Sequence, residues 1–250
     1  MAVKHLLILG GTAEARELAR RVAITIPKKV RVTTSLAGRR AKAPALPGDV
    51  RIGGFGGIDG LVDYINENAV DLVIDATHPF SAIISDHANA AAEATGVPRL
   101  QLLRPLWQLP PTAEWIEVDD LTDAARDLPR FAKRVFLTTG VRGLEAFSGL
   151  VDIWFLVRLM DPPAEPPPLA QLELITGKPP YAIEDERAIL TDHDIDTLVT
   201  KNSGGEGTEA KITAAAEAGV TIILIRRPAA EPGPVAETVD EAFAWVEDHV

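Results

Sequence analysis

Three short segments in the first part of the chain carry residue types that could bind a nucleotide. The first is Gly10-Gly11-Thr12, which follows an apolar run and precedes a helical pattern. Two glycines permit a tight turn, and the amino end of the following helix offers backbone N–H groups and partial positive charge to a phosphate. Thr12 could cap that helix or donate its hydroxyl to the phosphate. The segment lacks the G-x-G-x-x-G spacing, so an ordinary strand–helix turn is the alternative.

The second segment lies about 20 to 25 residues further on, where dinucleotide-binding domains usually carry an acid for the ribose 2′-hydroxyl. Here the sequence is TTSLAGRRAK, without an acid, and Ser35, Gly38 and Arg39 stand at the end of a β-branched run. An arginine at this position suits a 2′-phosphate. The pattern therefore favours NADP(H) over NAD(H), with a solvated basic loop as the alternative.

The third group of residues follows two later strands and should lie at the same sheet edge. The run GGFGG, which includes Gly54, Phe55 and Gly56, permits close approach of a ligand to the backbone, although a tight turn would also explain it. In DATHPF, His78 could donate a proton or orient a nicotinamide, because histidine titrates near neutral pH. A structural hydrogen bond is the alternative role for His78. The expected coenzyme-binding residues are Gly10, Gly11, Thr12, Ser35, Gly38, Arg39, Gly54, Phe55, Gly56, Thr77, His78 and Pro79, with His78 also the catalytic candidate.

Two turns in the second half of the chain are rich in hydroxyls, glycines and cations. They are LTTGVRG at 137–143 and TKNSGGEGTEAK at 200–211. Each follows a predicted strand, and both have the composition of anion-binding turns, which suits carboxylates or phosphates. An ordinary loop with a capping threonine is the alternative. The expected substrate-binding residues are Thr139, Arg142, Lys201, Asn202, Ser203, Gly204 and Lys211.

Alternation of apolar runs with helical stretches predicts an α/β fold with parallel sheets in two domains. The proline-rich stretch 105–111 indicates a crossover, which divides the chain into domains 1–105 and 106–250. The capping box of Thr238 and Glu241 begins a last helix, and DPPAEPPP at 161–168 is too rich in proline for a helix or an inner strand. We expect strands at 5–9, 30–35, 49–52, 70–75, 99–103, 115–118, 135–139, 153–159, 197–200 and 220–225, and helices at 12–23, 58–66 and 82–94.

Composition excludes several classes of protein. The 250 residues carry a formal net charge of −11 and no cysteine, which disfavours nucleic-acid binding and rules out disulfides and thiolate chemistry. No apolar run approaches the roughly 18 residues that would cross a bilayer, so we expect no membrane association and a cytoplasmic location. The histidines show no metal-ligand spacing, so no metal site is expected.

Six of these motifs occur together in an order that resembles a known family. LGGTAEARELA, TSLAGR, GGFGG, DATHPFS, LTTG and KNSGG are similar to the precorrin-6A reductases of cobalamin (vitamin B12) biosynthesis, a family that includes the cobalt-precorrin-6A reductases. The resemblance implies two Rossmann-like domains with the active site in the cleft between them. It also implies NADPH-dependent reduction of one double bond of a tetrapyrrole, precorrin-6A, to give precorrin-6B. Transient contact with neighbouring pathway enzymes is a further expectation.

The resemblance assigns roles to the motifs and leaves two choices open. It places Gly10, Gly11 and Thr12 at the phosphates, Ser35, Gly38 and Arg39 at the 2′-phosphate, and GGFGG and DATHPF near the ribose and nicotinamide. It does not decide whether the macrocycle is metal-free or contains cobalt, and a non-catalytic NADPH sensor is the alternative from another class. Because a carboxylate-rich macrocycle would be repelled by the net charge, we expect cationic anchors near strand ends. The candidates are Arg104, Arg142, Arg158, Lys201 and Lys211.

Overall fold

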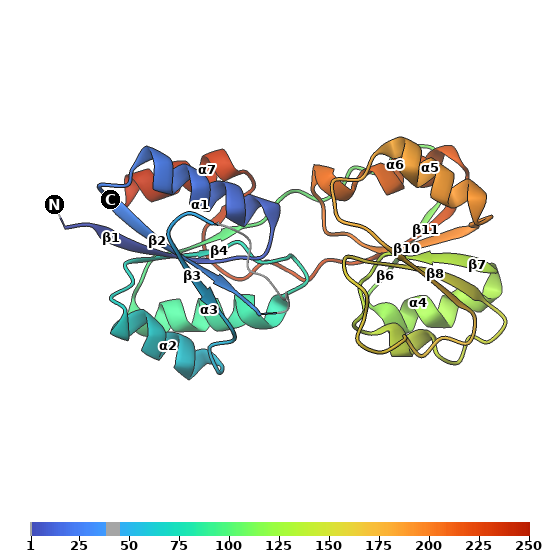
Figure 1. The fold of residues 1–250 in the computed structure, drawn as a ribbon, viewed down its shortest axis with the longest axis horizontal. Helices are drawn as coiled ribbons and strands as arrows, with labels where there is room; N and C mark the ends of the chain where they lie inside the picture. Colours follow the sequence, from blue (N-terminus) through green and yellow to red (C-terminus); the bar gives the residue numbers. More distant parts are fainter. Residues whose placement is uncertain (1, 39–45) are drawn as a thin grey trace. The chain divides into compact units, whose positions relative to one another are not determined.

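The computed structural model describes residues 2–38 and 46–250. The chain forms two compact units, of which unit 1 comprises Met1–Arg104 and Pro228–Val250, and unit 2 comprises Pro105–Arg227. Within the described residues each unit contains a six-stranded sheet whose strand pairs are all parallel, with helices on both faces (Figure 1). The predicted α/β class with two parallel-sheet domains is therefore confirmed.

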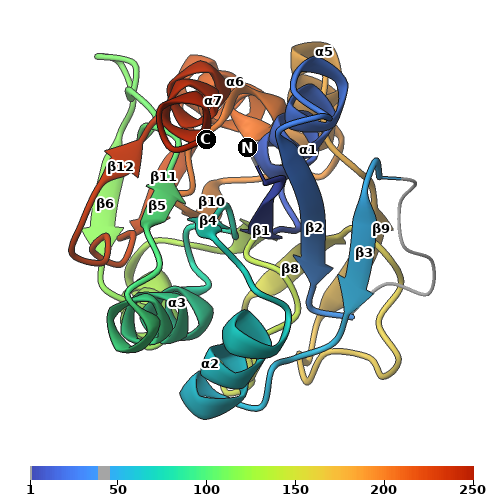
Figure 2. The ribbon, with the colours of Figure 1, turned by 90° about the vertical axis from the view of Figure 1, so that its left-hand side faces the viewer.

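Unit 1 has the strand order β12-β5-β4-β1-β2-β3. Helices α1 and α7 cover one face of its sheet, and α2 and α3 cover the other (Figure 2). The chain moves outward from β1 through β2 to β3 and then returns to the other side of β1, so β1 and β4 flank the topological switch point where parallel α/β sheets bind ligands. The elements are β1 (Lys4–Leu9), α1 (Ala13–Thr25), β2 (Val30–Leu36), β3 (Asp49–Ile52), α2 (Ile58–Glu67), β4 (Leu72–Asp75), α3 (Ala82–Thr95), β5 (Arg99–Leu102), β12 (Val235–Ala236) and α7 (Val239–Asp248).

Unit 2 repeats this arrangement with the order β6-β11-β10-β7-β8-β9. Helices α5 and α6 cover one face of the sheet and α4 the other (Figure 1). Its switch point lies between β7 and β10. The elements are β6 (Trp115–Val118), α4 (Leu121–Asp127), β7 (Arg134–Leu137), β8 (Trp154–Leu159), β9 (Leu172–Thr176), α5 (Ile183–Asp192), β10 (Thr197–Lys201), α6 (Ala210–Glu217) and β11 (Thr221–Ile225), with short 3₁₀ turns at Leu128–Arg130, Leu144–Phe147 and Glu206–Thr208.

The C-terminal segment corrects the predicted domain division. The crossover begins at Pro105 as expected, but Pro228–Val250 belongs to unit 1 and not to the second domain. β12 pairs with β5, and the apolar residues Ala242, Phe243 and Val246 of α7 are buried in the same core as α1. Burial of that apolar face against unit 1 is the physical reason for the return.

The predicted strands and helices match those of the structure to within about two residues at each end, but no bounds were predicted for β9, β12, α4, α5 and α6. Thr238 and Glu241 form the predicted capping box at the start of α7. The segment 161–168 contains no helix or strand, as its prolines require. No helix in the described ranges is long and apolar enough to span a membrane.

Candidate functional site

The turn after β1 needs glycine at both predicted positions. The Gly10 amide donates to the Ser35 carbonyl at 2.9 Å, and a Cβ on Gly10 would lie 3.0 Å from the Thr34 methyl group. Gly11 has a φ of 122°, which side chains rarely adopt, and a Cβ there would meet no atom within 4 Å. The turn is therefore tight at Gly10 and open at Gly11, beside the amino end of α1.

Thr12 caps α1 with its hydroxyl. The Oγ1 atom accepts from the Ala15 amide at 3.1 Å and donates to the Ala76 carbonyl at 2.7 Å. Thr12 therefore ties the glycine turn to the end of β4. Of the two predicted roles the structure supports capping, because the hydroxyl proton already has an acceptor and donation to a phosphate would break that bond.

The edge formed by β2 and β3 carries a guanidinium that the sequence analysis missed. Arg51 pairs in register with Ser35 and donates to Ser35 Oγ at 3.3 Å and to the carbonyls of Gly53 at 2.5 Å and Gly54 at 2.8 Å. The predicted Gly38 follows β2 with a φ of 79°. The predicted Arg39 lies outside the described residues.

The GGFGG segment is a backbone turn that also holds an aromatic contact. Gly53, Gly56 and Gly57 all have positive φ angles, so the glycines meet the conformational demand that the tight-turn alternative proposed. The Phe55 ring packs at the edge of Tyr64, with 5.2 Å between centroids, and lies 3.8 Å from the Arg51 guanidinium carbon. Contact of Gly54, Phe55 and Gly56 with a coenzyme stays a prediction.

The DATHPF segment is organised around a buried carboxylate. Asp75 is 1% exposed, and its Oδ1 accepts from the Thr77 amide at 3.1 Å and from the Thr77 hydroxyl at 2.7 Å. Its Oδ2 is buried without a hydrogen-bond partner within the described residues. His78 is exposed and its Nδ1 accepts from the Phe80 amide at 3.2 Å. Since α3 begins only at Ala82, Pro79 belongs to the turn and not to the helix.

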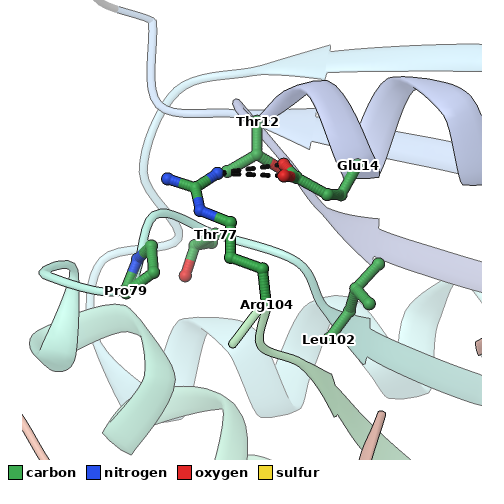
Figure 3. A pocket seen from close by; sticks show the side chains of 6 residues that line it. All are labelled: Thr12, Glu14, Thr77, Pro79, Leu102 and Arg104. Carbon is green, nitrogen blue, oxygen red and sulfur yellow. Dashed lines mark hydrogen bonds and ion pairs between the residues drawn. The ribbon is translucent and has the colours of Figure 1, made fainter. Parts of the chain in front are cut away.

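A small pocket brings the glycine turn and DATHPF together (Figure 3). It is lined by Thr12, Glu14, Thr77, Pro79, Leu102 and Arg104. The dashed lines in Figure 3 join Arg104 to Glu14, whose two carboxylate oxygens both lie 3.1 Å from Arg104 Nη1. Arg104 therefore neutralises an acid in the first turn of α1, directly beside the candidate phosphate site. This contact differs from the predicted role of Arg104 as a substrate anchor.

In unit 2 the LTTG and KNSGG turns meet at the switch point between β7 and β10. Lys201 Nζ donates to the Thr139 carbonyl at 2.9 Å. Burial, and secondly the positive charge of Arg142, lower the pKa of the Lys201 ammonium. Thr139 Oγ1 and Asn202 Oδ1 are buried without a hydrogen-bond partner within the described part of the chain. Six of the seven predicted substrate residues, all except Lys211, thus belong to the two turns that meet at this sheet edge.

The KNSGG turn is held by the crossover segment, which the sequence analysis treated only as a connection. A Cβ on Gly204 would lie 1.9 Å from the Pro105 carbonyl oxygen. Trp107 Nε1 donates to the Gly205 carbonyl at 3.0 Å, and the Lys211 ammonium lies 5.0 Å from the Trp107 ring centroid. Because Lys211 is 5% exposed, its predicted substrate contact stays a prediction beside this observed packing role.

Arg158 is not available as an anchor, and this prediction was wrong. Its Nη1 donates to Glu186 Oε1 at 2.5 Å, with side chains 6% and 1% exposed. The guanidinium carbon lies 3.9 Å from the Tyr181 ring centroid. The side chain points into the core between β8 and α5, where it compensates a buried carboxylate.

The chain is similar to known proteins over nearly its whole length. A family model described as precorrin-6x reductase CbiJ/CobK matches residues 5–247. The precorrin-6A reductase of Rhodococcus erythropolis is 48% identical, over 97% of each chain. The cobalt-precorrin-6A reductase of Priestia megaterium is 29% identical, over 94% of this chain and 95% of that one. A solved structure of CobK precorrin-6A reductase is 39% identical, with a TM-score of 0.91 over 99% of this chain and 97% of that one.

Among the described residues no cluster of three or more potential metal-binding side chains is present.

Proposed function

The chain belongs to the precorrin-6x reductase family, and from this premise we propose that it reduces one double bond of precorrin-6A with NADPH. The product would be precorrin-6B, in cobalamin biosynthesis. The observation that carries the coenzyme part is the Gly10-Gly11 turn, which stands at the β1/β4 switch point and opens onto the amino end of α1. Cytoplasmic location and transient contact with neighbouring pathway enzymes stay predictions.

The residues of unit 1 fit a dinucleotide. The open side of Gly11 leaves room for a pyrophosphate, and the Arg104–Glu14 pair removes the negative charge that would otherwise repel it. Ser35 stands where a 2′-phosphate is expected, and Arg39 keeps that role on sequence grounds alone. When bound, the coenzyme supplies hydride. The contribution of the protein is to position the reactants, which can account for much of the rate enhancement.

The residues of unit 2 fit a carboxylate-bearing substrate. Arg142 and Lys201 provide positive charge within a chain of net charge −11. Thr139 Oγ1 is buried and lacks a protein partner in the described residues, and its hydroxyl can donate a hydrogen bond to a ligand carboxylate. We therefore place the peripheral carboxylates of the macrocycle at this edge.

The comparisons favour the metal-free substrate over the cobalt-containing one. Relatives called precorrin-6A reductase are 40% to 48% identical to this chain, whereas those called cobalt-precorrin-6A reductase are 29% to 31% identical. Both substrates would present the same carboxylate periphery, so the difference lies in the chain as a whole and not in the residues of the candidate site. Metal-free precorrin-6A is accordingly the first substrate to test.

The test is incubation of the protein with precorrin-6A and NADPH under anaerobic conditions. We expect the absorbance of the reduced nicotinamide to fall in step with the change in the pigment spectrum, with one coenzyme oxidised per macrocycle. Gly11→Val places a branched side chain on the open face of the turn and should abolish coenzyme binding. Binding of NADPH without oxidation would support the sensor alternative, and absence of NADPH binding to the wild-type protein would refute the proposal.

A further inference from the structure

Arg51 is a fixed cation at the carboxyl edge of the sheet in unit 1. Register places it beside Ser35, and three hydrogen bonds join it to Ser35 Oγ and to the carbonyls of Gly53 and Gly54. Its guanidinium carbon also lies 3.8 Å from the Phe55 ring centroid. The head group of a long flexible side chain is therefore held in one place before any ligand binds, which lowers the entropic cost of using it in binding.

The charge of Arg51 is not neutralised by a carboxylate of the described residues. Its hydrogen-bond acceptors there are one hydroxyl and two backbone carbonyls, and no ion pair with Asp or Glu is formed within those residues. A guanidinium has five N–H donors, and these bonds use three of them. Arg51 is also only partly buried. Positive charge and N–H groups thus remain for an anion, in a protein whose net charge is strongly negative.

Ser35 is oriented by the same contact. Ser35 is 6% exposed, and its Oγ accepts from Arg51 at 3.3 Å. An oxygen that accepts a hydrogen bond can still donate its own proton, and within the described residues the Ser35 hydroxyl proton has no acceptor. One phosphate oxygen could therefore receive hydrogen bonds from both side chains.

We propose that Arg51 and Ser35 together bind the 2′-phosphate that distinguishes NADPH from NADH. The inference rests on the proposed function, because it assigns the coenzyme specificity of that same site. The planar fork of N–H donors in a guanidinium matches the geometry of phosphate oxygens. The adjacent GGFGG turn lets a ribose phosphate approach the guanidinium without obstruction from side chains at Gly53 and Gly54.

A purely structural role makes a different prediction. If Arg51 only holds the Gly53 and Gly54 carbonyls, its removal should disturb the turn and weaken the binding of NADPH and of NADH by the same factor. If Arg51 reads the phosphate, the loss should be confined to NADPH. Competition by adenosine 2′,5′-bisphosphate and by AMP makes the same distinction without the nicotinamide half of the coenzyme.

The experiment measures dissociation constants of NADPH, NADH and the two adenosine phosphates for wild type, Arg51→Met, Arg51→Lys and Ser35→Ala. Arg51→Met should raise the dissociation constants of NADPH and the bisphosphate roughly 10- to 100-fold, which is the range for a lost hydrogen bond to a charged group. The dissociation constants of NADH and AMP should stay within about threefold of the wild-type values. The dissociation constants for Arg51→Lys should lie between those of wild type and Arg51→Met, since lysine keeps the positive charge but lacks the paired N–H donors of the guanidinium. Arg31→Met is the matched control, because Arg31 is an exposed arginine at the other end of β2. This variant should change the dissociation constant of neither coenzyme.

Equal loss of both coenzymes in Arg51→Met, or no loss, would overturn the inference. If Arg51→Met does not fold, Arg51→Lys and Ser35→Ala decide the question, and a loss confined to NADPH in both is expected. A wild-type protein that binds both coenzymes equally would overturn the inference while leaving coenzyme binding in place. A wild-type protein that binds neither would instead refute the proposed function.

Discussion

Removal of the Arg158 guanidinium should destabilise unit 2 strongly. In the structure this group donates to Glu186 at 2.5 Å, and the two side chains are 6% and 1% exposed. Arg158→Met would leave the Glu186 carboxylate buried without a counter-charge, which costs about 3 to 5 kcal/mol in comparable pairs. The loss of the stacking contact with Tyr181, at 3.9 Å from the ring centroid, adds to this penalty.

Replacing both partners separates a buried charge from simple loss of packing. In Arg158→Met with Glu186→Leu no uncompensated charge remains, so the double variant should lie within about 1 kcal/mol of wild type. The control is Arg187→Met. Arg187 lies in α5, as Glu186 does, and forms an ion pair with Glu217 in which both side chains are 48% exposed. Exposed pairs contribute at most about 1 kcal/mol.

Urea unfolding followed by tryptophan fluorescence measures these differences, because Trp107, Trp115 and Trp154 lie in unit 2 and only Trp245 lies in unit 1. The reasoning is refuted if Arg158→Met changes the free energy of unfolding by less than about 1 kcal/mol, the size expected of a surface pair. It is also refuted if the double variant is as unstable as the sum of the single ones. Unchanged stability with a raised KM for the macrocycle would restore Arg158 to the substrate site.

Three further predictions follow from the candidate site and the core of unit 1. Arg104→Gln should lower the affinities for NADPH and NADH by the same factor, about fivefold, because repulsion between an unneutralised Glu14 carboxylate and the phosphates costs roughly 1 kcal/mol. Adding Glu14→Gln should restore both affinities in a binding titration. His78→Ala should lower the single-turnover rate by less than about 100-fold, and a loss of over about 1,000-fold with coenzyme binding intact would make His78 an essential acid. Burial lowers the pKa of His5 below its usual 6.5, so the unfolded chain takes up the proton first and the free energy of unfolding should fall as pH drops below that value. Urea unfolding at about pH 7.5 and about pH 5.5 measures this pH dependence. The variant His5→Gln should lose the dependence, whereas His249→Gln, which changes an exposed histidine, should keep it.

The sequence predicted elements well wherever burial alone decides them. Continuous apolar runs such as 5–9 and 220–225 became inner strands because both of their faces are covered by helices. β9 was missed since its residues are partly exposed and follow a proline-rich loop. β12 has only two residues and is defined by its pairing with β5, and such a contact between distant segments leaves no local pattern.

The candidate site shows the same division between local and distant contacts. The glycine turn and its capping threonine were visible in the sequence because strand, glycines and helix are contiguous. Arg51 was missed and Arg158 misjudged for one common reason. Each is a single arginine within a strand, and only its partner in space, Ser35 for Arg51 and Glu186 for Arg158, shows whether it donates to a hydroxyl at the sheet edge or neutralises a carboxylate in the core.

The discontinuous make-up of unit 1 bears on how the protein can be synthesised. Unit 2 is one uninterrupted stretch, Pro105–Arg227, whereas unit 1 needs α7 and β12, which are translated after the whole of unit 2. During translation from the amino end, α1 and its side of the first sheet must wait with an uncovered apolar surface while the inserted unit folds. Chaperone demand during biosynthesis should therefore concentrate on α1 and the face of the first sheet that α7 later covers.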